Sequence, residues 1–174
     1  MPSIAPTAHT RGDHTTDSWI TPKELIDRLG PFDLDPCACI PQPWPCAKNQ
    51  YTVEDNGLLQ EWRGLVWCNP PYGRETTHWL NRLALHGNGI ALVFARTETR
   101  AFFDNVWPKA DLLLFIRGRL TFHRPDGSMP PKGHNSGGPS VLIAYGDQAA
   151  NRLRMNADLG VIVQQDQRDA VSRS

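Results

Sequence analysis

The chain has 174 residues, 40% apolar and 21% charged, a composition that suits one soluble domain around a single core. Lys plus Arg and Asp plus Glu number 18 each, which argues against a protein held on nucleic acid by a general excess of positive charge. The sequence has no run apolar enough for a membrane span or a secretory signal, and its four cysteines are too few for a disulfide scaffold. We therefore expect a cytoplasmic protein with no membrane partner.

One domain is expected between two flexible ends. Residues 1–16 are polar and aperiodic, which predicts a flexible N-terminal arm, and residues 164–174 predict a flexible C-terminal tail. Residues 17–163 alternate between helical and strand patterns without internal repeats, so we expect them to form a single domain.

The first part of this domain contains two short regular elements and an irregular loop. Thr21 and Pro22 precede a helical pattern at residues 23–29, and we expect Thr21 to be the N-cap and Pro22 the first helical residue. Residues 32–34 form a candidate strand. Residues 36–47 contain four prolines and three cysteines, a composition that predicts a loop.

The rest of the domain alternates between apolar strands and helices. The expected strands are residues 64–68, 90–95, 112–116, 140–145 and 160–163, and the expected helices are residues 78–85 and 101–107. The strands are continuously apolar, which indicates a sheet covered on both faces. We expect a doubly wound α/β sandwich with a mostly parallel sheet and helices on both faces. Ligands of such folds bind beyond the carboxyl ends of the strands.

The tetrapeptide Asn69-Pro70-Pro71-Tyr72 directly follows a predicted strand and is the strongest catalytic candidate. By itself it also fits a rigid turn that ends a strand. An aromatic exocyclic amine is a poor nucleophile, because its lone pair is delocalised into the ring. The side-chain oxygen of Asn69 and the backbone carbonyl of Pro70 can accept both amine hydrogens, and they stabilise the positive charge that develops as the amine attacks a methyl sulfonium.

The remaining residues of the tetrapeptide suit the same chemistry. Tyr72 offers a flat face on which a base turned out of a duplex can stack. Pro70 and Pro71 hold the two acceptors in place, so little reorganisation is needed during reaction. The methylated amine is strongly acidic, and we therefore assign no general base.

Six segments between residues 17 and 122 form a more specific pattern than the tetrapeptide alone. They are DSWITP at 17–22, FDLDPCA at 32–38, DNGL at 55–58 before Trp62, NPPYG at 69–73, ARTET at 95–99 and RGRLTF at 117–122. In this order they resemble the phage-type DNA N6-adenine methyltransferase (Dam-like) family, which uses S-adenosylmethionine. The resemblance implies a Rossmann-like methyltransferase fold, methyl transfer to the N6 amine of a flipped adenine in DNA, and a role in restriction-modification or regulation.

The resemblance also implies which residues bind the cofactor. The segment around Thr21 corresponds to one that lies along the methionine part of S-adenosylmethionine. The loop that begins at Asp35 corresponds to one whose acid and backbone amides contact the amino acid moiety, and Asp55 to an acid that hydrogen-bonds the adenine amine. The expected cofactor-binding residues are Trp19, Thr21, Pro22, Asp33, Asp35, Pro36, Cys37, Ala38 and Asp55.

Simpler roles remain open for some of these residues. Asp33 and Asp35 also fit helix or turn caps, and Trp19 also fits a core position. Asp55 also fits an Asx-type turn with the two residues that follow it.

A local excess of positive charge indicates a surface for DNA. Between Arg96 and Lys132 there are seven Lys or Arg residues and four acids, and such a patch engages phosphates even in a neutral chain. It also fits an ordinary solvated surface. The candidate DNA-binding residues are Arg96, Arg117, Arg119, His123, Arg124 and Lys132. We expect the loop at residues 122–139 to close over or position the target base. We expect no obligate protein partner, and a monomer or weak homodimer.

Other functional classes fit the sequence less well. The four cysteines lack the paired C-x2-C spacing of structural zinc sites, so we expect no bound metal. The H-x-E and P-C-x-x-C motifs of zinc nucleobase deaminases are absent from the sequence. Protein glutamine N5-methyltransferases use the same tetrapeptide and remain an alternative, as does a catalytically silent DNA-binding protein of the same fold.

Overall fold

The computed structural model describes residues 19–131 and 137–164. The expected N-terminal arm and Lys132 lie outside these residues, as does the expected tail beyond Gln164. The strands are β1 (Leu34–Asp35), β2 (Asn49–Gln50), β3 (Val66–Cys68), β4 (Gly89–Phe94), β5 (Leu112–Ile116), β6 (Ser140–Tyr145) and β7 (Gly160–Gln164). The helices are α1 (Lys23–Leu29), α2 (Thr76–His86), α3 (Arg100–Asn105), α4 (Asp147–Arg154) and the short 3₁₀ helix η1 (Ala157–Leu159).

Every helix and strand expected from the sequence is present, with its ends shifted by no more than two residues. Three elements were not expected: β2, α4 and η1. The two residues of β2 are polar and exposed, so no apolar pattern marks them. Helix α4 is polar apart from its buried Ala149, Ala150 and Leu153, a stripe too short to stand out in the sequence.

Helix α1 begins one residue later than expected. Pro22 is the N-cap because its backbone is extended, and its carbonyl accepts the amide hydrogens of Leu25 and Ile26 at 3.0 and 3.3 Å. Thr21 is buried, and its hydroxyl has no hydrogen-bond partner. The expectation that Thr21 caps this helix is therefore wrong.

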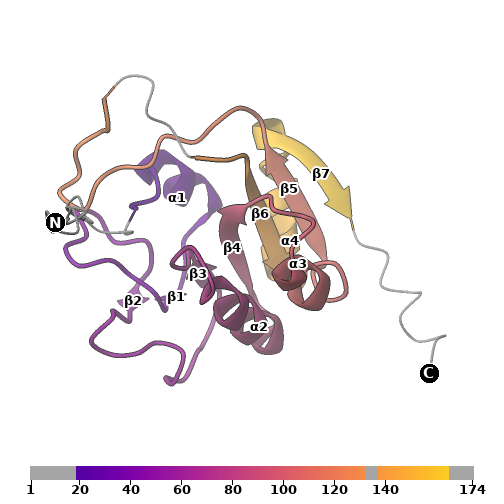
Figure 1. Ribbon diagram of the computed structural model, residues 1–174, viewed down its shortest axis with the longest axis horizontal. Helices are drawn as coiled ribbons and strands as arrows, with labels where there is room; N and C mark the ends of the chain where they lie inside the picture. Colours follow the sequence, from indigo (N-terminus) through magenta and orange to yellow (C-terminus); the bar gives the residue numbers. More distant parts are fainter. Residues whose placement is uncertain (1–18, 132–136, 165–174) are drawn as a thin grey trace, which may run out of the picture.

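The seven strands of the described residues form one mixed sheet in the order β2-β1-β3-β4-β6-β5-β7 (Figure 1). Strands β2, β1, β3 and β4 are parallel. Strand β6 lies between β4 and β5 and runs antiparallel to both, and β7 is antiparallel to β5. The expectation of a mostly parallel sheet is not confirmed, since most paired residues are in antiparallel ladders. A continuous apolar run reports burial on both faces and carries no information about strand direction.

Helices cover both faces of the sheet, as expected. One core lies between the sheet and helices α1 and α4, and the other lies between the sheet and helices α2 and α3. Along β4, Ile90 and Leu92 belong to the first core, whereas Ala91 and Val93 belong to the second. Within the described part of the chain, no helix is long and apolar enough to cross a membrane.

After β5 the chain crosses back toward the beginning of the domain (Figure 1). The backbones of Ile20 and His123 exchange two hydrogen bonds of 2.9 Å each. The His123 ring meets the ring of Trp44 edge-on at a centroid distance of 5.0 Å, and the Trp44 indole N–H donates to the carbonyl of Thr21 at 3.0 Å. These contacts hold together three segments: residues 20–21, the loop at residues 36–47 and the segment after β5.

Replacing Leu92 by alanine is expected to lower the free energy of unfolding by about 2–5 kcal/mol, because Leu92 is completely buried and its removal leaves a cavity. Leu85 is 72% exposed on α2, so Leu85→Ala is a matched control with an expected change within about 0.5 kcal/mol. Urea unfolding of both variants measures the difference. Equal effects of the two substitutions would contradict the assignment of Leu92 to the core.

Candidate functional site

A cavity of about 350 Å³ lies beyond the carboxyl ends of β1 and β3. Three segments line it: residues 36–40 after β1, part of residues 52–57, and residues 69–72 after β3. The side chains of Trp19 and Trp79 complete its wall. The structure therefore brings the tetrapeptide together with four of the expected cofactor-binding residues, which are Trp19, Pro36, Cys37 and Ala38.

Asn69 enters this cavity with one polar atom unpaired. Its Nδ2 donates a hydrogen bond of 3.0 Å to the carbonyl of Trp19, which fixes the orientation of the amide. Its Oδ1 is buried and has no hydrogen-bond partner. Buried acceptors without a partner are rare and costly in folded proteins. Asn69 Oδ1 is therefore free to accept a hydrogen bond from a group that enters the cavity.

Tyr72 lies at the other end of the tetrapeptide and is stacked on Phe94. The two rings are 4.4 Å apart and nearly parallel, with an angle of 9° between their planes. Tyr72 lines the cavity and Phe94 does not, so Phe94 supports the tyrosine ring from outside. Burial raises the pKa of Tyr72 to about 12, so the phenol is neutral at physiological pH. Sequence reasoning missed Phe94, whose one signal is its place at the end of the strand next to β3.

A smaller hollow of about 10 Å³, room for one water molecule, adjoins the main cavity and shares Trp19, Cys37 and Asn69 with it. Three of its residues carry buried polar atoms with no partner: the hydroxyl of Thr21, the indole nitrogen of Trp67 and the Oδ1 of Asn69. Nothing in the sequence marked Trp67, which lies in the middle of a buried strand.

Asp35 lies in the same small hollow and is only 4% exposed. The backbone N–H of Cys37 donates to its Oδ1 at 3.1 Å, so Asp35 does close a turn. Burial nevertheless outweighs this bond and raises the pKa of Asp35 from 3.8 to about 7. A buried carboxylate that is half protonated near neutral pH is suited to pair with a cationic ligand.

Two cysteine thiols meet at the base of the cavity. The Sγ atoms of Cys37 and Cys68 are 3.8 Å apart. The hydrogen bond to Cys68 and burial hold the pKa of Cys37 well above its ordinary value, so Cys37 is a thiol and not a nucleophilic thiolate. In residues 19–131 and 137–164, no three His, Cys, Asp or Glu side chains form a group that could hold a metal ion.

Three expected cofactor-binding residues lie in neither hollow. Pro22 caps α1, and Asp33 accepts a hydrogen bond of 2.7 Å from the backbone N–H of Leu65. Asp55 is exposed and accepts hydrogen bonds from the backbone and hydroxyl of Thr52, which lower its pKa. Asp33 and Asp55 thus stabilise local structure, although Asp55 closes its turn with Thr52 and not with the residues after it.

The segment around Asp55 still forms one wall of the cavity. The backbone of Gly57 lies so close to the carbonyl of Pro36 that a Cβ atom would not fit between them. The indole N–H of Trp62 donates to the carbonyl of Gly57 at 2.8 Å, and Trp62 stacks on Trp79 at 6.3 Å. Gly57, Trp62 and Trp79 were not predicted as site residues, although the first two belong to motifs noted in the sequence.

The expected DNA-binding residues among the described part of the chain are mostly exposed. Arg96 is exposed and lies over the ring of Phe94 at 5.9 Å, which places it beside the tetrapeptide. Arg117, Arg119 and Arg124 are also exposed. His123 is half-buried, and its Nδ1 lies 3.1 Å from the carbonyl of Gly127, so its contacts are structural.

Comparison with known families identifies one match. The model of a family described as DNA N-6-adenine-methyltransferase (Dam) matches residues 8–167. No curated protein and no solved structure matches the chain.

Replacing Asp33 by alanine is expected to lower the free energy of unfolding by about 1–3 kcal/mol, because the N–H of Leu65 loses its acceptor. Affinity for S-adenosylmethionine, the cofactor that the resemblance implies, is measured by calorimetry and should not change, since Asp33 lies outside both hollows. Asp27→Ala removes another carboxylate, from an exposed ion pair on α1, and serves as the control with a smaller loss. Reduced cofactor affinity in a fully stable Asp33 variant would contradict this role.

Proposed function

The chain belongs to the DNA N-6-adenine-methyltransferase (Dam) family, as the resemblance predicted, and from this premise we propose that it transfers a methyl group from S-adenosylmethionine to the N6 amine of an adenine turned out of duplex DNA. The observation that carries the proposal is the buried, unpaired Oδ1 of Asn69 at the carboxyl end of β3. A ligand amine is the missing donor.

The tetrapeptide activates the amine in this mechanism. Asn69 Oδ1 and the carbonyl of Pro70 accept its two hydrogens, which frees the nitrogen lone pair from the ring and stabilises the positive charge that forms on nitrogen. The bond from Asn69 Nδ2 to Trp19 holds the acceptor in place before the substrate arrives. Once methylated, the nitrogen loses a proton to solvent. Bound S-adenosylmethionine supplies an electrophilic methyl group on a sulfonium.

Tyr72 holds the adenine ring in the same mechanism. Its cavity-facing side stacks on the base, while Phe94 supports its other side at 4.4 Å. The base, Tyr72 and Phe94 then form a three-layer stack. Because this contact already holds the ring of Tyr72, the tyrosine side chain loses little further entropy when the base binds.

The polar lining of the two hollows suits parts of S-adenosylmethionine. The small hollow has room for one water-sized group, and the carboxylate of Asp35 and the hydroxyl of Thr21 there suit the ammonium group. In the main cavity, Trp79, Pro71 and Val53 offer apolar surface to the adenine ring. The position beyond the carboxyl ends of the parallel strands β1 and β3 supports a Rossmann-like methyltransferase arrangement.

Transfer of the labelled methyl group from S-adenosylmethionine to unmethylated duplex DNA tests the proposal. Nucleoside analysis of the product is expected to yield N6-methyladenine. Label in a glutamine-containing protein substrate, with none in DNA, would favour the protein N5-methyltransferase alternative. DNA binding without cofactor binding would favour a catalytically silent protein.

Asn69→Ala is expected to slow methyl transfer by about 10²–10³-fold, equivalent to about 2.7–4 kcal/mol, by analogy with the loss of one donor from an oxyanion hole. Single-turnover kinetics with saturating cofactor and DNA measure the loss. Asn151→Ala on α4 removes an asparagine that lines neither hollow and should keep full activity. A near wild-type rate for the Asn69 variant would refute the assigned role.

Cofactor affinity should fall as the pH falls through about 7, because protonation of Asp35 removes the negative charge that faces the ammonium group. The apparent Kd is expected to rise about tenfold between about pH 8 and about pH 6. Calorimetry at a series of pH values measures this change. Asp35→Asn should bind more weakly at high pH and lose the pH dependence, and an unaltered pH dependence in that variant would assign the titration to another group.

A further inference from the structure

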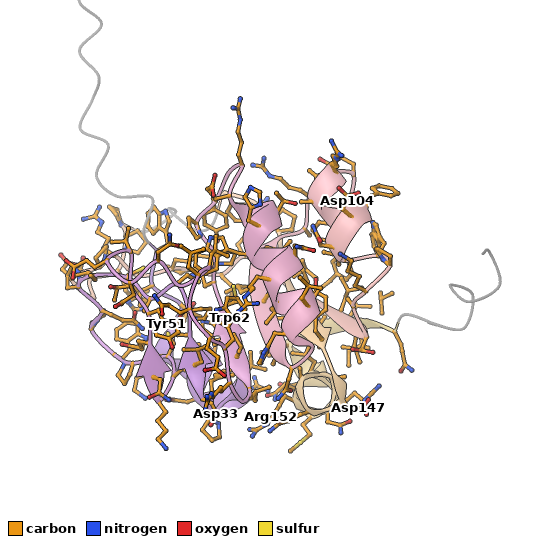
Figure 2. All side chains as sticks on the ribbon, turned by 90° about the horizontal axis from the view of Figure 1, so that it is seen from below. Asp33, Tyr51, Trp62, Asp104, Asp147 and Arg152 are labelled. Atoms are coloured by element: carbon orange, nitrogen blue, oxygen red, sulfur yellow. The ribbon has the colours of Figure 1, made fainter. Side chains whose placement is uncertain are left out.

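A second hollow lies between α2 and α3, outside the catalytic cavity. Figure 2 shows the two helices side by side, with Asp104 on α3. The space between them, here called the α2–α3 groove, has a volume of about 620 Å³. Its polar lining includes Arg74, His78 and Asn81 on the α2 side and Arg100, Asp104 and Lys109 on the α3 side.

Positive charge exceeds negative charge in this groove. Arg74, Arg100 and Lys109 face the single carboxylate among the described residues that line it, that of Asp104. Arg100 Nε donates to Asp104 Oδ2 at 3.2 Å, so one of the three cations is already matched. Arg74 and Lys109 remain as the unmatched charges.

Two neutral amides hold the ammonium group of Lys109 in place, and neither neutralises its positive charge. Its Nζ donates to the side-chain oxygens of Asn81 at 3.2 Å and Asn105 at 3.1 Å. Both amides are neutral, so they orient the ammonium group while its positive charge stays uncompensated. Asn105 Nδ2 also donates to Thr77 Oγ1 at 3.1 Å, which ties the two walls of the groove together.

The groove begins where the catalytic tetrapeptide ends. Arg74 lies two residues after Tyr72, and the hydroxyl of Thr76 donates to the carbonyl of Pro71 at 2.8 Å. The helical part of the α2 wall, from Thr77 to Asn81, is about 6 Å long, close to the roughly 7 Å that three successive phosphates of one DNA strand span along the duplex axis. A strand whose base occupies the catalytic cavity thus has a cationic path for its backbone directly beside it.

We propose that the α2–α3 groove binds the phosphodiester backbone of DNA next to the target adenine, with Arg74 and Lys109 as phosphate contacts. This inference rests on the proposed function and extends it to residues outside the segments that carry the family resemblance. The described residues that line the groove include no large apolar side chain, and its cationic and amide groups suit the oxygens of a phosphate backbone.

The test measures binding of a short fluorescein-labelled duplex by anisotropy between about 50 and 200 mM KCl. Arg74→Gln and Lys109→Gln are each expected to weaken binding and to reduce the slope of log K against log salt by about 0.9, the value for one lost phosphate contact. Lys109→Arg keeps the charge and should retain the slope. Arg154→Gln on α4, across the sheet, is the matched control and should behave as wild type.

Asp104→Asn is expected to change DNA affinity in the opposite direction. The substitution frees Arg100 from its carboxylate partner, so DNA affinity should rise and the salt slope should steepen. Affinity for S-adenosylhomocysteine should be the same in all five variants, because the groove and the cavity have no residue in common.

The outcomes separate the two proposals. Wild-type chain that binds cofactor but no DNA would overturn the proposed function and the groove with it. If the wild-type chain methylates DNA but the Arg74 and Lys109 variants keep the wild-type salt slope, the proposed phosphate binding by the groove is overturned and the proposed function stands.

Discussion

The parallel pairing of β1 with β3 is the constraint on which the rest of the site depends. Leu34 pairs with Val66, so both strands end at the same edge of the sheet, although more than thirty residues separate them in sequence. The buried carboxylate of Asp35 and the unpaired oxygen of Asn69 meet only because of this pairing. Both strands are short, and bonds just before them support the alignment. The amides of Asp33 and Leu34 donate to the carbonyl of Leu65, and the amide of Leu65 donates to the carboxylate of Asp33.

The fold leaves polar atoms unpaired where the proposed ligands bind. The hydroxyl of Thr21, the indole N–H of Trp67 and the Oδ1 of Asn69 each carry a desolvation cost that no intramolecular contact offsets. The hydroxyl of Tyr72, which also lines the main cavity, is a fourth such atom. Three further buried polar atoms without a partner, on Arg82, Asn88 and Ser140, line neither hollow, whereas the hydroxyl of Tyr145 donates to the carbonyl of Asn105 at 2.7 Å. Four unpaired atoms around two adjoining hollows are the pattern expected of a preorganised site.

The sequence predicted the elements and the centre of the site but not the roles of all its acids. Continuous apolar runs located the main strands, because a strand buried on both faces is apolar at every position. Such runs do not depend on strand direction, so they could not predict that β6 lies antiparallel between β4 and β5. The chemistry of Asn69-Pro70-Pro71-Tyr72 predicted the site from local sequence alone. The role of Asp33 depends on its contact with Leu65, and that of Trp67 on the position of its indole nitrogen, and neither can be derived without tertiary structure. Phe94 likewise becomes part of the site only through its contact with Tyr72.

Three parallel strands of the mixed sheet are shorter than the antiparallel strands, so the two parts of the sheet are expected to differ in their free energy of local opening. Strands β1, β2 and β3 contain two, two and three residues, whereas the ladder of β4 with β6 alone pairs six residues. Amides of the antiparallel half are therefore the ones expected to exchange with deuterium last, and those of the short parallel half to exchange through local unfolding well before the whole chain opens. The proposed cofactor lies against the parallel half, so its binding is expected to raise the free energy of local opening there toward that of the antiparallel half. Under this proposal, a long antiparallel ladder serves as the scaffold for a parallel edge that becomes more ordered when the cofactor binds.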